Sequence, residues 1–146
     1  MRVPFLLGRA LFGGYFVMSG INHFKQTRHL SRFAEAKGVP GPTIAVRATG
    51  AMLIAGGASI LLGFKPKLGA TALIGFLAGV SPIMHDFWNE DAEQRMNDII
   101  NFTKNLALVG GAAALMSVEE PWPASLSPQP TARQRARRML RESIAA

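Results

Sequence analysis

Hydrophobic residues fill four long stretches of this chain, and only a few polar positions interrupt them. The stretches cover residues 3–24, 43–64, 68–88 and 99–118. At about 1.5 Å of rise per residue, a helix of this length spans roughly 30 Å, the thickness of the hydrocarbon core of a bilayer. Residues 52–63 and 69–83 contain no charged residue, so they lack the polar stripe of a helix in a soluble bundle. The pattern predicts an all-α protein with four transmembrane helices.

The connections between these stretches indicate how the helices are arranged. Pro4 and Pro42 can each occupy a first helical turn, where a missing amide hydrogen costs nothing. Residues 27–37 form an amphipathic pattern that we expect to be a short helix in the membrane interface. The turn around Pro66 is so short that the second and third spans must be antiparallel neighbours. We therefore expect a four-helix transmembrane bundle with up-down-up-down topology and an interfacial helix between spans one and two.

The composition changes after Val118. We assign residues 1–118 to the membrane domain and residues 119–146 to a Pro-rich linker followed by an Arg-rich tail. Residues 131–146 carry five arginines against one acid, Glu142. Because this segment lacks aromatic side chains for base stacking, we expect it to bind anionic lipid at the cytoplasmic surface rather than nucleic acid. The net charge of +7 has the same interpretation.

Charge and cysteine content limit the topology and the chemistry further. Eight Lys and Arg residues lie on the side of the two termini and five on the other side. By the positive-inside rule, this predicts a multi-pass protein of the cell inner membrane with both termini in the cytoplasm.

The chain has no cysteine, which excludes disulfides, thiol catalysis and thiolate ligands. A redox role would need a bound cofactor or a partner protein.

Small residues recur inside the predicted spans, where they can let helix backbones approach closely. Tight packing within one bundle is the favoured interpretation, and association of several copies is the alternative. The residues concerned are Gly13, Gly14, Gly56, Gly57, Gly75, Gly79, Ala107, Gly110 and Gly111.

Polar residues gather near one end of the predicted bundle. Alternating helices bring the end of span one, the start of span two, the end of span three and the start of span four to the same side of the membrane. Convergent polar groups within a membrane often mark a functional pocket. The candidate pocket consists of Asn22, His23, Arg47, His85, Asp86, Lys104 and Asn105.

Several structural roles compete with this pocket. Three cationic side chains could extend their charged ends to the headgroups: Arg47, Lys104 and Arg9. Of these, Arg9 lies about 21 Å from His23 by helix rise, toward the opposite face of the membrane. The histidines could be satisfied by water and backbone, and Asp86 could pair with Arg47. A metal centre formed by His23, His85 and Asp86 is disfavoured by the adjacent cations, so we expect no metal.

Several short motifs resemble the recurring pattern of the DoxX family. They are residues 19–24 (Ser-Gly-Ile-Asn-His-Phe), Gly56 and Gly57 before 61–63, residues 85–88 (His-Asp-Phe-Trp), and residues 101–107 (Asn-Phe-Thr-Lys-Asn-Leu-Ala) before Gly110 and Gly111. The resemblance runs from about residue 7 to residue 115, and residues 101–107 are its most specific part. It implies a four-helix membrane protein, with some relatives acting as subunits of thiosulfate:quinone oxidoreductase or partnering membrane oxidoreductases. The resemblance assigns no catalytic role to any residue of this chain.

Two functional hypotheses follow. In the first, the chain is a small subunit of a membrane redox system: a quinone or a small oxyanion binds near His23, Arg47, His85 and Lys104. Phe24, Phe87, Trp88 and Phe102 are available to face a ring, and electrons come from a membrane-associated oxidoreductase. Histidine can supply or accept a proton and a cation can hold a carbonyl oxygen, but no intrinsic cofactor is expected.

In the second hypothesis, the chain is a membrane scaffold or assembly partner without chemistry. A transporter has less support, since no pair of broken helices stands out.

Overall fold

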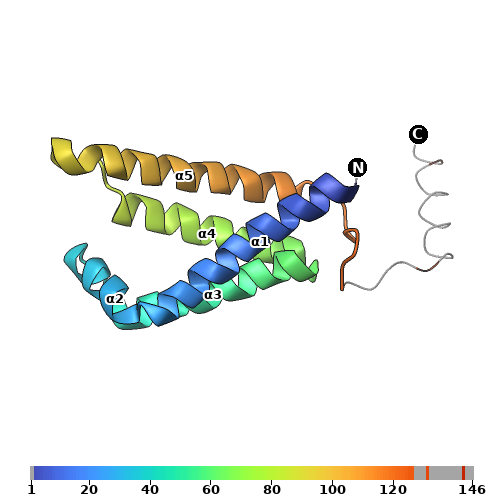
Figure 1. The fold of residues 1–146 in the computed structure, drawn as a ribbon, viewed down its shortest axis with the longest axis horizontal. Coiled ribbons are helices and arrows are strands. Elements are labelled where there is room, and N and C mark those ends of the chain that lie inside the picture. Colours follow the sequence, from blue (N-terminus) through green and yellow to red (C-terminus); the bar gives the residue numbers. More distant parts are fainter. Residues whose placement is uncertain (1, 127–130, 132–142, 144–146) are drawn as a thin grey trace.

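The computed structural model describes residues 2–126, 131 and 143, and that part of the chain contains five helices (Figure 1). Four of them are long and apolar enough to cross a membrane, and a short fifth helix lies between the first two. The helices are α1 (Arg2–Lys25), α2 (Thr27–Ala36), α3 (Pro42–Leu62), α4 (Pro66–Met84) and α5 (Ala92–Met116). The expected all-α bundle with a short helix between spans one and two is confirmed.

Large apolar side chains are exposed along all four long helices. Exposed apolar side chains on every spanning helix are typical of a surface that lipid covers. The exposed side chains include Val3, Leu7, Leu11, Ile44, Leu68, Ile83, Ile100 and Leu106, whereas the buried core includes Phe16, Leu53, Ile60, Leu73 and Leu77. The exterior of the bundle therefore faces lipid, and the chain is a multi-pass membrane protein.

Glycines allow α1 and α3 to pack backbone against backbone. A Cβ atom added at Gly13 would lie 2.8 Å from the carbonyl oxygen of Gly57, and one added at Gly20 would lie 2.6 Å from that of Gly50. The expected packing role of the small residues is thus found between these two helices. Gly75 and Gly79 differ, because a Cβ at either position would meet nothing within 4 Å among the described atoms. They lie on the exposed side of α4.

The fourth long helix begins earlier than the hydrophobic pattern predicts. The pattern places its start at residue 99, but α5 begins at Ala92. The Asp91 side chain caps this helix by accepting a hydrogen bond from the backbone amide of Gln94 at 3.2 Å. An acid followed three residues later by Gln is a helix-start signal that hydrophobicity alone misses. As a consequence, Asp98 is helical and Lys104 lies deeper in the helix than expected.

The segment after α5 folds back onto the bundle. The composition predicts a linker and tail from residue 119 onward, yet Trp122 is fully buried and packs edge-on against Phe5 with ring centroids 5.3 Å apart. Arg9, also buried, donates to the carbonyl oxygens of Pro123 at 2.8 Å and Ala124 at 2.9 Å. Residues 119–126 therefore close the end of the bundle at which α1 begins. Apart from Thr131 and Ser143, the Arg-rich tail lies outside the described residues.

Candidate functional site

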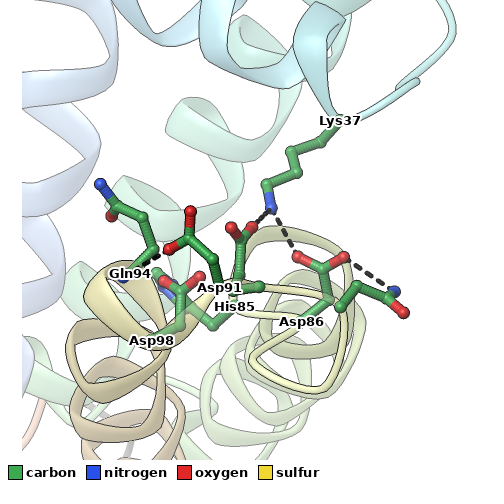
Figure 2. A network of polar contacts seen from close by, with 8 residues as sticks. Lys37, His85, Asp86, Asp91, Gln94 and Asp98 are labelled. Carbon is green, nitrogen blue, oxygen red and sulfur yellow. Dashed lines mark hydrogen bonds and ion pairs between the residues drawn. The ribbon is translucent and has the colours of Figure 1, made fainter.

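An ion-paired cluster joins α2 to the connection between α4 and α5. The Lys37 ammonium donates to Asp86 Oδ1 at 2.5 Å and to Glu90 Oε1 at 2.6 Å, and Asn89 donates to the other oxygen of Asp86 at 3.1 Å. Figure 2 shows the Lys37 side chain reaching from the end of α2 toward Asp86. These contacts raise the pKa of Lys37, chiefly through the hydrogen bond to Asp86. The same hydrogen bond lowers the pKa of Asp86, with a further contribution from Asn89. Asp86 thus pairs with Lys37 rather than with Arg47.

His85 and Asp98 form a second pair beside this cluster. His85 caps the C-terminus of α4, and its Nδ1 lies 3.1 Å from Oδ1 of Asp98, one of the buried polar residues (Figure 2). Because a carboxylate can only accept, the Nδ1 atom must carry the hydrogen. The other ring nitrogen, Nε2, makes no hydrogen bond to any residue that the structure describes. The pair fixes both the orientation and the tautomer of the imidazole.

Three carboxylates of this region come close enough together to suggest a cation site. Ligand oxygens of Asp86, Glu90 and Asp98 lie within 4.8 Å of one another. The Lys37 ammonium already contacts two of them, and His85 holds the third. A positive side chain therefore occupies the position that a cation would need, and the cluster is accounted for by ion pairing within the protein.

His23, in the last turn of α1, makes contacts that are separate from the ion-paired cluster. Its Nδ1 lies 2.8 Å from the carbonyl oxygen of Ser19, an acceptor, so this nitrogen also carries the hydrogen. The ring meets Phe76 of α4 edge-on at a centroid distance of 6.2 Å. His23 is therefore placed between the last turn of α1 and the middle of α4. The neighbouring Asn22 is exposed and accepts a hydrogen bond from Gln26 at 2.7 Å.

The other predicted pocket residues are less constrained. Arg47, in the second turn of α3, and Lys104, in α5, are both exposed and make no hydrogen bond or ion pair with residues 2–126. Asn105 is half-buried and likewise has no side-chain hydrogen bond within that range. The position of Arg47 fits extension of its charge to the headgroups. Lys104 lies six residues beyond Asp98, about 9 Å farther into the membrane domain.

The aromatic residues expected to face a ring divide into two groups. Phe87, Trp88 and Phe102 pack edge to face, with centroids 5.0 Å apart for the first two and 5.5 Å for Phe87 and Phe102. Trp88 is about half exposed, the usual state of a tryptophan at a membrane interface. Phe24 stands apart from these three and is also exposed. The trio thus anchors the corner between α4 and α5.

The seven predicted residues lie in one half of the bundle but do not form a single contact network. Among the described residues, no hydrogen bond or ion pair joins any two of the seven. Four members of the polar network are not among the predicted residues: Lys37, Asn89, Glu90 and Asp98. The start signal at Asp91 could have found Asp98, because it places that acid two turns into a helix. Lys37 could not be found in this way, since its partners lie about fifty residues away in the sequence.

Four apolar spans with an exposed apolar exterior and a polar network at one end define a multi-pass α-helical membrane protein. Residues 5–86, more than half of the chain, match the family model of DoxX. The chain therefore belongs to the DoxX family. The match ends at Asp86, so it does not include residues 101–107, on which the resemblance in the sequence depends most. No curated protein and no solved structure matches the chain.

Proposed function

We propose that this chain is a small subunit of a membrane redox system that binds a quinone headgroup or a small oxyanion in the half of the bundle carrying His23, His85 and Lys104. One observation carries the proposal: both histidines have Nδ1 held by an acceptor, Ser19 O in one case and Asp98 in the other. In each neutral ring, Nε2 is then a fixed acceptor with no partner among the described residues. Such a nitrogen is suited to accept a proton or a hydrogen bond from a ligand.

Lys104 supplies the complementary group. Its ammonium is a donor with three hydrogens, it lies on the membrane side of Asp98, and nothing in the described part of the chain pairs with it. A quinone carbonyl or an anionic oxygen can accept from it, while a quinol hydroxyl can donate to an imidazole. A cation within a membrane segment is costly unless it has a partner, so a polar ligand would offset that cost.

The electrons in this proposal come from a partner oxidoreductase with its own redox centre. The chain itself has no cysteine and hence no thiolate ligand for a cluster. Its share of the reaction is to bind the quinone and to pass protons through the imidazoles as the quinone is reduced to a quinol. We further propose that the protein lies in the cell inner membrane with both termini in the cytoplasm, on the basis of the Lys and Arg distribution.

A second candidate function is a non-catalytic scaffold or assembly partner. It is favoured by the ion pairs of Lys37, because they assign Asp86, a member of the candidate pocket, to a connection between α2 and the α4–α5 loop. In this function, the polar residues at this end of the bundle fix the relative positions of the helices. A partner protein then binds the surface that these helices form.

Comparison of His23→Ala and Lys104→Ala separates the two candidates, with Lys67→Ala as a control that removes an exposed cation at the other end of α4. Abundance in membranes and affinity of the purified protein for a short-chain quinone would be measured for each. Normal abundance with at least tenfold weaker quinone binding in both site variants, but not in the control, is the expected result. Loss of abundance with unchanged affinity of the remaining protein would favour the scaffold.

A further inference from the structure

An open hollow of about 450 Å³ lies at the corner where α1 ends and α2 begins. It is lined by Lys25, Gln26, Arg28, His29 and Arg32. The three permanent cations and the imidazole make no hydrogen bond or ion pair with the rest of the described chain. Glu35, the acid on α2, does not pair with Arg32. The hollow therefore presents uncompensated positive charge together with several hydrogen-bond donors.

Arg28, His29 and Arg32 lie on the face of α2 that points away from the bundle. Ser31 and Ala34 are the buried residues of α2, which packs against α3. Within α2, Arg32 follows Arg28 by four residues and His29 by three, so these three side chains share a helix face roughly opposite the buried pair. Lys25, the last residue of α1, joins them in the lining of the hollow. This separation explains why the cations are left for a ligand from outside the bundle.

The position along the membrane normal identifies the kind of ligand. Lys25 is the last residue of a 24-residue spanning helix, so the hollow lies where the chain leaves the hydrocarbon. Phe24 and Phe33, on either side of the basic residues in the sequence, are exposed apolar rings suited to acyl chains. Arginine binds phosphate through paired N–H donors, and lysine adds a point charge. A site with cations at headgroup level and apolar rings beside them matches a lipid better than a free anion.

We propose that this hollow binds the phosphate headgroup of an anionic phospholipid. Arg28 and Arg32 hold the phosphate oxygens, Lys25 adds charge, and Gln26 and His29 offer hydrogen bonds to the rest of the headgroup. The hollow adjoins the candidate pocket, because Gln26 donates to Asn22, but this proposal does not depend on quinone binding.

The test measures lipid binding by the purified full-length protein in neutral detergent micelles that contain phosphatidylcholine. Dioleoylphosphatidylglycerol is titrated in, and bound lipid is counted by native mass spectrometry. We expect phosphatidylglycerol to bind in preference to phosphatidylcholine. Arg28→Gln with Arg32→Gln should weaken its binding roughly 30-fold, which corresponds to about 2 kcal/mol at about 1 kcal/mol per basic residue near a lipid surface. Lys65→Gln with Lys67→Gln, the charge-matched control at the other end of the bundle, should leave that affinity unchanged.

Three outcomes would overturn the proposal: no preference for phosphatidylglycerol, equal loss in both double variants, or displacement of the lipid by an equal concentration of glycerol phosphate or inorganic phosphate. The last would assign the hollow to a soluble oxyanion. Thermal melting checks that the variants fold. If the double variant melts early, Arg28→Gln alone should still weaken binding about fivefold, and Arg32→Lys should retain part of the affinity.

Discussion

The guanidinium of Arg9 donates a hydrogen bond of 2.8 Å to the carbonyl oxygen of Pro123, a residue 114 positions later in the chain. This contact, together with the burial of Trp122 against Phe5, attaches the segment after α5 to the start of α1. A charged side chain inside a transmembrane helix thus has a structural partner, and its charge does not need to reach the headgroups.

Replacing Trp122 by alanine should therefore destabilise the protein by about 3 to 5 kcal/mol, the usual cost of emptying a large buried aromatic site. The lower melting temperature in detergent should be accompanied by faster proteolysis within residues 119–126. Trp88→Ala is the matched control, because this second tryptophan is about half exposed. Equal melting temperatures for the two variants would contradict the packing of Trp122 in the core.

The α1–α3 contact gives a second prediction. Gly57→Ala should destabilise the bundle by about 1 to 3 kcal/mol, because the new Cβ would lie 2.7 Å from the backbone oxygen of Gly13 and the helices would have to separate. Gly79→Ala adds the same methyl group where no described atom lies within 4 Å, so the melting temperature of this variant should stay at or above that of the wild type. If Gly57→Ala were as stable as Gly79→Ala, the close approach of α1 and α3 would be wrong.

The His85–Asp98 pair can be tested by a double-mutant cycle. His85→Ala leaves the buried carboxylate without its donor, whereas Asp98→Ala leaves the imidazole without its acceptor. The stability losses of the two single variants should add up to more than the loss of the double variant. The difference, which is the coupling energy, should be about 0.5 to 3 kcal/mol in thermal or chemical unfolding. Strictly additive losses would show that the two side chains do not interact.

The Lys37 ion pairs predict a dependence of stability on pH. Since Lys37 lowers the pKa of Asp86, the pair stabilises the protein above the usual carboxyl pKa and loses that effect as the pH falls through the lower folded-state value. Because the pKa of Lys37 is raised, this side chain contributes its full share of stability below the usual lysine pKa. That stability is lost only in strong alkali. Lys37→Met should be less stable than the wild type at pH 7, and the difference should shrink below about pH 4.

Melting temperatures of both proteins from pH 7 to pH 3 would check this behaviour, and Lys67→Met serves as the control for loss of an exposed lysine. The difference at pH 7 should be small, since the paired side chains remain partly exposed to solvent. A difference that stayed constant across this range would mean that Asp86 is not the group being stabilised.

Substitution of Lys104 tests whether this residue binds a ligand or stabilises the bundle. Because Lys104 has no partner among the described residues, Lys104→Leu should leave stability unchanged or raise it by up to about 2.5 kcal/mol, since a membrane-embedded charge is removed. The same substitution should abolish quinone binding under the proposed function. A marked loss of thermal stability in ligand-free protein would instead show that Lys104 holds the bundle together.

The amino-acid sequence by itself determined the number of spans, because uninterrupted apolar stretches of membrane length leave the backbone no alternative to helices in lipid. It also determined the amphipathic character of residues 27–36 and, through alternation of the helices, the half of the bundle in which His23 and His85 lie. These features depend on local composition and spacing, which can be followed along a single chain.

Only the tertiary structure decided which polar groups meet. Lys37 pairs with Asp86 and Glu90, and Arg9 binds the backbone beyond Pro121, because packing of α2, α4 and the last segment brings distant parts of the chain together. Similarly, Gly57 contacts α1 while Gly79 faces outward, although both occur in similar small-residue patterns. A periodic pattern specifies that a face exists, but the rotation and crossing of each helix are set by side-chain packing over the whole bundle, and these decide what lies opposite that face.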